Sequence, residues 1–252
     1  MTLNIFKVSV AIKVILSILL IFSFSPGKAF SQSPVADSVY YSKAVSGLLN
    51  YYQNSPDKKL VLYNGPEHRG YFRQIKGFAY FDTDKMVEGN VHYDHVWYKL
   101  PLLYDLVMDQ VIILHYDGLY KLSLISERVD QFNMNGHFFK KIGDTYLDSK
   151  LFPGFYEEIY AGDSISLYAR RSKMISELLN MQSLEREFIS KNQYYFLIRG
   201  SYHPVNSKKE MYALLGNKKK EVAVYLRKNH VKFRKSKEAA LVIASKKYDD
   251  KL

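Results

Sequence analysis

Two histidines are the residues of this sequence whose types and spacing best suit metal chemistry. His92 and His95 lie three positions apart with Asp94 between them, so the segment offers imidazole and carboxylate ligands for zinc or a similar ion. A metal site also needs a third protein ligand and groups that orient the imidazoles, and the sequence identifies neither. We therefore expect no metal cofactor and interpret His92 and His95, the candidate ligands, as surface histidines beside a turn.

Acid and base catalysis would need carboxylates in a different arrangement. Asp105 and Asp109 are better explained as turn residues, because aspartate bonds to nearby backbone N–H groups. Glu157 and Glu158 are adjacent, so on a strand they face opposite ways. The chain also lacks a nucleophile elbow, a Walker loop and a dinucleotide fingerprint. The sequence thus predicts no catalytic and no cofactor-binding residue, and an enzyme is the less favoured hypothesis.

The first 31 residues have the three parts of a secretory signal. Lys7 and Lys13 form a basic region, residues 14–24 form a short apolar core, and Ala29-Phe30-Ser31 is a small-x-small cleavage site before Gln32. The apolar core is shorter than the roughly 20 residues that span a bilayer. We expect cleavage after Ser31 and no transmembrane segment in the mature chain.

The sequence contains no cysteine. Disulfides, zinc-thiolate sites and a cysteine nucleophile are thereby excluded, and stability must come from a buried core. An exported protein without disulfides suits the envelope of a bacterium. The protein is therefore expected to be exported and to be periplasmic or outer-membrane-associated.

The positive charge is concentrated at the C-terminal end. Residues 208–252 hold 14 lysines and arginines against 5 carboxylates, whereas residues 32–207 hold 19 against 20. One interpretation is a docked helical segment with a solvated basic face. The other is a surface for an anionic membrane or polymer, and nucleic acid is disfavoured as its partner by the export signal. The candidate residues of that surface are Lys218, Lys219, Lys220, Arg227, Lys228, Lys232, Arg234 and Lys235.

Strand and turn signals run through the middle of the chain. Asp117-Gly118 and Asn135-Gly136 predict two-residue hairpin loops in which both central residues take positive φ. Asp94-His95 predicts a further short hairpin, and Pro101 predicts an edge or a bend. Further strands are expected at residues 59–63 and 77–81, with hairpins around residues 161–163 and near Gly200.

The expected registers sort the side chains between the two faces of the sheet. The second loop pairs Phe132 with Phe139, a cross-strand aromatic pair that holds the register. The first loop pairs His115 with Tyr120 and directs both toward the core, so we expect His115 to be a buried histidine with satisfied hydrogen bonds. The full core face of this hairpin is expected to carry Val111, Ile113, His115, Tyr120, Leu122 and Leu124.

Helices are expected at both ends of the mature chain. Ser33-Pro34 is a helix start, and the apolar positions that follow have helical spacing up to Tyr52. Ser207 and Glu210 form a capping box that begins the C-terminal helices, of which residues 236–248 are the last. Residues 173–188 suit either a strand or a helix and stay undecided.

Together these features predict a mainly β, α+β fold. The expected architecture is an antiparallel β-meander that forms a half-barrel, a barrel or a sandwich, with an N-terminal helix and a C-terminal helical tail. The expected division is a signal peptide at residues 1–31, the β domain with its helix at residues 32–206, and a basic helical segment at residues 207–252.

Seven short segments carry a resemblance to known proteins. They are Leu62-Tyr63-Asn64-Gly65, Gly89-Asn90-Val91-His92-Tyr93, Leu100-Pro101-Leu102-Leu103-Tyr104-Asp105, Glu127-Arg128-Val129-Asp130-Gln131-Phe132, Gly154-Phe155-Tyr156-Glu157, Tyr194-Tyr195 and Tyr248-Asp249. With these segments the chain resembles a group of uncharacterised exported proteins from Bacteroidetes-type Gram-negative bacteria. The resemblance covers most of the mature chain and implies a secreted or periplasmic protein, without implying any catalytic residue.

The aromatic content suggests what such a protein does. The 22 tyrosines and 15 phenylalanines would line a concave sheet able to hold a lipid, a glycan or a peptide. The favoured function is a non-catalytic binding or assembly protein of the cell envelope, and the alternative is an envelope hydrolase whose site escapes motif analysis. His92, His95 or His115 beside a carboxylate in a cleft would favour the hydrolase, and an apolar tyrosine-lined groove would favour binding.

Overall fold

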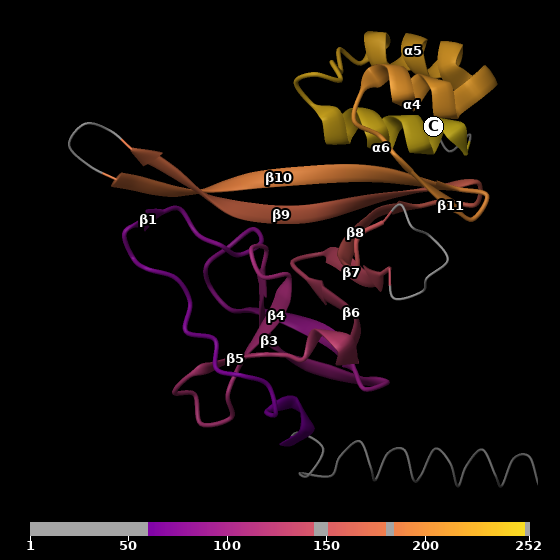
Figure 1. Ribbon diagram of the computed structural model, residues 1–252. Coiled ribbons are helices and arrows are strands. Elements are labelled where there is room, and N and C mark those ends of the chain that lie inside the picture. Colours follow the sequence, from indigo (N-terminus) through magenta and orange to yellow (C-terminus); the bar gives the residue numbers. More distant parts are fainter. Residues whose placement is uncertain (1–59, 144–150, 180–183, 250–252) are drawn as a thin grey trace, which may run out of the picture. The chain divides into compact units, whose positions relative to one another are not determined.

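The strands form one continuous sheet in the computed structural model, which describes residues 60–143, 151–179 and 184–249 (Figure 1). The strands are β1 (Ile75–Lys76), β2 (Val87–Tyr93), β3 (Val96–Asp105), β4 (Gln110–Leu114), β5 (Lys121–Ser123), β6 (Val129–Met134), β7 (His137–Ile142), β8 (Gly154–Ala161), β9 (Ile165–Leu179), β10 (Leu184–Ile198) and β11 (Ser201–Pro204). They pair in the order β1-β10-β9-β8-β7-β6-β2-β3-β4-β5, and β11 pairs with β10.

This sheet confirms the mainly β prediction and narrows it. Among the described residues β1 and β5, the two ends of the order, are not paired with each other, so the sheet is open and does not close into a barrel. Neighbouring strands are antiparallel, except that the short β1 runs parallel to β10. The predicted signal peptide and the helix expected at residues 33–52 lie outside the described residues.

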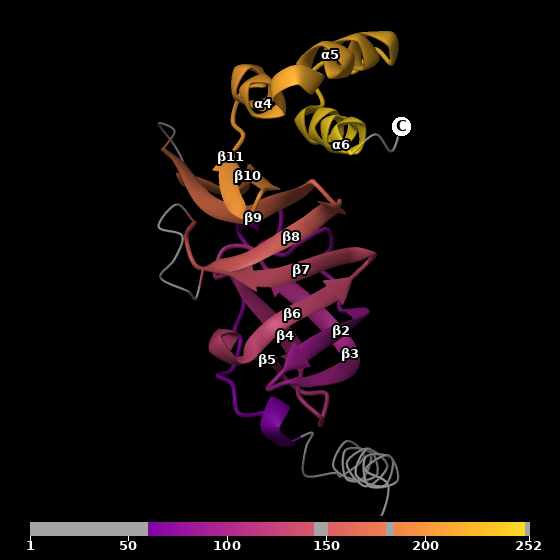
Figure 2. The ribbon, with the colours of Figure 1, turned by 90° about the vertical axis from the view of Figure 1, so that its right-hand side faces the viewer.

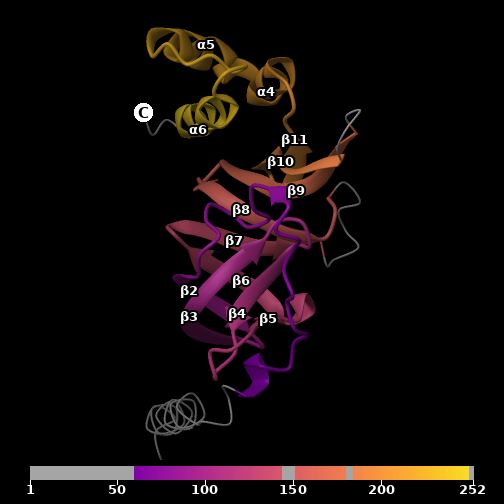
Figure 3. The same ribbon diagram turned by 90° about the vertical axis from the view of Figure 1, so that its left-hand side faces the viewer.

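Two-residue turns join strands where the sequence predicts them. Asp94-His95, Asn135-Gly136 and Arg199-Gly200 all have positive φ at both positions, as turns that match strand twist require. Phe132 faces Phe139 in the predicted register, and the two rings stack with their centroids 4.7 Å apart. Figures 2 and 3 show β6, β7 and β8 following one another in the sheet.

The loop at Asp117-Gly118 differs from its prediction. β4 and β5 pair in the expected register, with Ile113 opposite Leu122. Only Gly118 has positive φ, however, and its N–H donates to the carbonyl of His115. This is the wider hairpin loop in which a turn is followed by one left-handed glycine. Tyr120, expected to face the core, is 39% exposed because it lies in this loop beyond the paired strands.

In three stretches the local sequence pattern did not predict the secondary structure. Residues 60–62 are helical, and residues 77–81 contribute only an isolated bridge from Tyr80, so the two strands predicted there are wrong. A short apolar run carries no period that separates strand from helix. The undecided stretch 173–188 is strand on both sides of the undescribed residues 180–183, since β9 and β10 pair along their full length from Leu179 and Leu184.

Two apolar clusters lie on one face of the sheet. Phe139, Glu157, Ala169 and Tyr194 stand opposite one another across β7, β8, β9 and β10, so they share that face. Phe139 belongs to a large aromatic cluster built on β2 to β8, whereas Ala169 and Tyr194 belong to a cluster that includes the C-terminal helices. Glu157 lies in this row between the two clusters.

The C-terminal helices begin where the capping box predicts. Helix α4 (Lys208–Leu215) has Ser207 as its N-cap, whose Oγ accepts the N–H of Glu210 at 3.2 Å. The 3-10 turn η2 (Gly216–Lys218), helix α5 (Lys219–Lys228) and helix α6 (Lys237–Tyr248) follow. Their buried side chains include Met211, Val222 and Leu241, as expected for a docked helical segment. In the described part of the chain, no helix combines the length and the hydropathy of a membrane span.

Candidate anion-binding site

The two candidate metal ligands converge on a single carboxylate at the surface. Nδ1 of His92 lies 2.7 Å from Oδ2 of Asp130, and Nδ1 of His95 lies 3.7 Å from the same atom. Asp94, which separates them in sequence, pairs instead with Arg128. No group of three or more such side chains among the described residues is placed to hold a metal ion. The His95 side chain is 91% exposed, as expected for a histidine beside a turn.

His115 is buried as predicted, although its hydrogen bonding is not satisfied as predicted. Its Nδ1 lies 2.8 Å from Oδ1 of Asp117 without the alignment of a hydrogen bond. The imidazole stacks on Tyr120, with centroids 4.3 Å apart, and meets the ring of Tyr63 edge-on. His115 is therefore part of an aromatic cluster beside the β4–β5 loop.

The turn role predicted for Asp105 is confirmed, whereas the side chain of Asp109 accepts the hydroxyl of Tyr104 and the N–H of Phe155 and, in the described part of the chain, bonds no backbone N–H of its own turn. Asp105 holds the turn after β3, because its Oδ1 accepts the backbone N–H groups of Val107 and Met108 at 2.8 and 3.1 Å. Asp105 is also buried and accepts the hydroxyl of Tyr71. Burial, followed by this hydrogen bond, raises the pKa of Tyr71, so the phenol remains a donor to the carboxylate.

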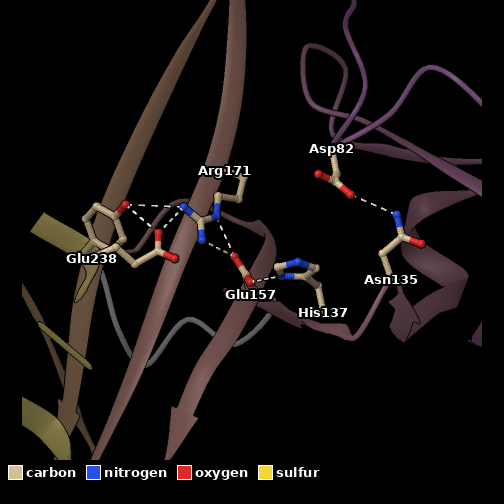
Figure 4. Close-up of polar contacts among 7 residues, drawn as sticks. Asp82, Asn135, His137, Glu157, Arg171 and Glu238 are labelled. Carbon is tan, nitrogen blue, oxygen red and sulfur yellow. Dashed lines mark hydrogen bonds and ion pairs between the residues drawn. The ribbon is translucent and has the colours of Figure 1, made fainter. Parts of the chain in front are cut away.

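A chain of charged side chains crosses the sheet between the two apolar clusters (Figure 4). Nδ1 of His137 on β7 lies 2.5 Å from Oε1 of Glu157 on β8. Arg171 on β9 donates from Nε to Oε2 of Glu157 at 2.6 Å and from Nη1 to Oε2 of Glu238 on α6 at 2.7 Å. The hydroxyl of Tyr194 on β10 donates to the same Glu238 oxygen at 2.9 Å. This chain attaches α6 to the sheet.

The surroundings of Glu238 favour its charged form. Burial raises the pKa of Glu238, but the hydrogen bonds and the charge of Arg171, with the bond from Tyr194, outweigh burial and hold the pKa below its ordinary value. Glu158 faces the other way, toward Lys140 and Tyr168, as the sequence predicts for adjacent strand residues. The arrangement is therefore a set of paired charges that positions α6.

The eight predicted cations have three different surroundings. Arg227, Lys232 and Arg234 line a cavity of about 580 Å³, which we name the basic cavity. Lys218 lines a second cavity of about 990 Å³. The other four are exposed and line neither cavity: Lys219, Lys220, Lys228 and Lys235.

Within the part of the chain that the structure describes, the basic cavity has positive side chains without negative partners. Lys208 at the start of α4 joins Arg227, Lys232 and Arg234 in its lining, and His230 adds an imidazole. No carboxylate lines the cavity, and among the described residues none of the four cations forms an ion pair. Unneutralised charge around a cavity attracts anions.

The second cavity has a mixed lining. Asp163 and Asp249 lie among its residues together with Arg199 and Lys218, so both signs of charge are present. Asp249 already accepts the hydroxyl of Tyr160 at 2.9 Å and the N–H of Ser164 at 3.0 Å. This cavity therefore shows no preference for an anion.

The sequence did not single out several residues that line the basic cavity, and it did not identify the charged chain as a unit. Lys208, Tyr212, His230 and Phe233 line the cavity but were not singled out. The alternation of basic and aromatic residues in Lys232-Phe233-Arg234 is the signal that would have found this segment. The charged chain has no such signal, because its members come from four strands and a helix that only the fold brings together.

Comparison with known proteins adds no relative. No family model, no curated protein and no solved structure matches the chain. The function is therefore argued from the geometry of the sites.

Proposed function

We propose that the protein is a non-catalytic cell-envelope protein that binds anionic lipids at a membrane surface through α4, α5 and residues 229–235. The observation that carries the proposal is the set of cations in and around the basic cavity that have no carboxylate partner among the described residues. A cluster of lysines and arginines attracts the negative surface of a membrane. The location in the envelope is inferred from the signal predicted at residues 1–31.

The alternative hydrolase has one observation in its favour. His137 is 39% exposed at its side chain and has the carboxylate of Glu157 against its Nδ1, which is the arrangement of a general base and its orienting acid. Glu157 is neutralised by Arg171, however, which also attaches α6 through Glu238. The pair is thus accounted for by the attachment of the helix, and none of these residues lines either cavity. Binding is the function that the geometry favours.

Sedimentation with lipid vesicles tests the proposal. The purified protein should sediment with vesicles that contain about 20% phosphatidylglycerol at ~0.1 M salt, and ~0.5 M salt should release it because ions screen the attraction. Vesicles of phosphatidylcholine alone should leave the protein in solution. If the protein stays in solution with the anionic vesicles at ~0.1 M salt, the proposal is wrong.

A charge-matched pair of variants locates the binding surface. Each lysine near an anionic membrane contributes roughly 1 kcal/mol, so replacing four of them by glutamine should weaken vesicle binding at least about 10-fold. The test variant carries this change at Lys219, Lys220, Lys228 and Lys235. The control carries the same change at four exposed lysines elsewhere and should bind like the unchanged protein: Lys76, Lys85, Lys99 and Lys191. Equal weakening in both variants would contradict the assignment to the helices.

A further inference from the structure

We infer that the basic cavity is a site for a lipid headgroup that ends in a phosphate monoester, an inference that rests on the proposed membrane binding. General attraction to a membrane needs only exposed lysines, such as Lys220 and Lys228, which lie outside the cavity. The cavity is a different feature, because four cations from separate parts of the chain line one half-open hollow of about 580 Å³. This volume lies within the range of small-ligand sites.

The cations of the cavity come from three separate parts of the chain. Lys208 stands at the start of α4, Arg227 stands in the last turn of α5, and Lys232 and Arg234 lie in the segment that leads to α6. A solvated basic face would lie on one helix, whereas these four cations come from three separate parts of the chain. Two of the four are arginines, whose planar guanidinium groups bind phosphate oxygens in pairs.

The charge of the cavity suits a phosphate monoester better than a diester. A monoester carries between about −1.5 and −2 charges near neutral pH and offers three acceptor oxygens, whereas a diester carries one charge. Four cations and an imidazole line the cavity, and no carboxylate is among its described lining residues. This positive charge is larger than the single negative charge of a diester. The terminal phosphate is therefore the group that the cavity would recognise.

The other part of the lining is apolar and points to a lipid as the bearer of that phosphate. Leu226 is buried, and Tyr212, Val231 and Phe233 are partly buried in the same apolar cluster. The ring of Tyr212 also has Nζ of Lys208 5.4 Å from its centroid, so the charged and apolar parts of the lining meet there. A ligand that joins a phosphate to an apolar group matches both parts.

His230 lines the cavity from the C-terminal end of α5. Helix α5 ends in a Schellman motif, in which the N–H of His230 bonds to the carbonyl of Arg227 and the N–H of Val231 bonds to that of Leu226. The left-handed position of this motif usually holds glycine, yet His230 occupies it with a φ of 56°. Histidine is less favourable than glycine at this left-handed φ, and the side chain of His230 lines the cavity.

The test compares two kinds of vesicle with equal surface charge. One contains phosphatidic acid, which ends in a phosphate monoester, and the other contains phosphatidylglycerol, which is a diester. The protein should bind the first roughly 10-fold more tightly, because only the monoester offers three free oxygens to the arginines. Binding to neither vesicle would contradict the proposed function, whereas equal binding to both would contradict only the cavity inference.

Variants assign the preference to the cavity. Joint replacement of Arg227 and Arg234 by methionine should abolish the preference for phosphatidic acid. The matched control replaces Lys220 and Lys228 by methionine and should weaken binding to both vesicles while the preference remains. A control that loses the preference would show that surface charge alone creates it. Soluble glycerol 3-phosphate should compete only weakly, and competition as tight as phosphatidic acid would overturn the assignment to a lipid.

His230→Gly gives a result that a structural role would not produce. Glycine relieves the left-handed position, so the midpoint of urea unfolding should rise, while removal of the imidazole should reduce the preference for phosphatidic acid. A higher midpoint with an unchanged preference would contradict a role for His230 in the cavity. A lower midpoint would contradict the account of its backbone position.

Discussion

Three arginines of the sheet and its turns differ from two arginines of the C-terminal helical segment in their pairing with carboxylates. In the sheet and its turns Arg128, Arg170 and Arg171 each lie beside a carboxylate within the same part of the fold. Among the described residues, Arg227 and Arg234 of the helical segment have none. Paired charges contribute to the fold and leave little charge for a ligand, whereas unpaired charges remain available. The difference locates structural electrostatics in the sheet and binding electrostatics in the helices.

The sheet and the C-terminal helices also differ in the size of the apolar side chains that they bury. The sheet cluster is built from large rings, with Tyr104, Phe132 and Phe139 fully buried and in mutual contact. The helices contribute smaller side chains to theirs, such as Val222 and Ala240. Large rings bury more area each and dominate core energetics. The largest fully buried side chains among the described residues therefore lie in the sheet or directly beside it.

The largest expected effect is the loss of Arg171. Arg171→Met leaves Glu157 buried without its cation, and removal of one partner of a buried pair typically costs about 3–5 kcal/mol of unfolding free energy. The control is Arg186→Met in the exposed pair with Glu177, where we expect a loss of at most about 1 kcal/mol. Urea unfolding at neutral pH measures both. Similar losses in the two variants would contradict the structural role given to the buried pair.

A smaller effect is expected at Glu238, which links that pair to α6. Because its pKa is held below the ordinary value of 4.5, its charge stabilises the fold fully above pH 4.5, and this contribution is lost as the pH falls through the lowered pKa. Glu238→Gln should therefore cost about 1.5 kcal/mol at pH 7, allowing for partial exposure to solvent, and less at about pH 3.

Urea unfolding of Glu238→Gln at the two pH values is the measurement, with Glu221→Gln on α5 as its control. Glu221 lies 3.9 Å from Lys247 in a largely exposed pair, so its replacement should change little at either pH. If Glu238→Gln loses the same unfolding free energy at both pH values, the packing of the side chain and not its charge attaches α6.

The sequence contained most of the information on the sheet. Turns such as Asn135-Gly136 have a backbone requirement that few residue types meet, so their positions and registers were predictable. The error at Asp117-Gly118 arose because the same residue pair also suits a wider loop. Residues 60–62 were misassigned because an apolar run lacks a diagnostic period, and the length of β9 depended on its pairing with β10, which no local pattern reports.

The sequence predicted only that the C-terminal segment is rich in basic residues, and not which of them form the candidate site. The excess of lysine and arginine after residue 207 indicated a binding surface, but which cations converge depends on the angles between helices. His230 shows this limit, because its role follows from a helix end at Asn229 that residue type alone does not place. The link from His137 to Glu238 spans residues far apart in sequence and needed the fold.

The smallest effect tests whether local bonds, and not charge pairs, hold the helical segment. Ser207 caps α4 through the N–H of Glu210, whereas Ser236, the N-cap of α6, makes no such side-chain bond. Ser207→Ala should therefore lower the unfolding free energy by about 1 kcal/mol, and Ser236→Ala by a few tenths of a kcal/mol at most. Urea unfolding of the two variants compares two serines at equivalent positions. Equal losses would mean that capping does not distinguish the two helices, and attachment through Glu238 would then be the main constraint on the segment.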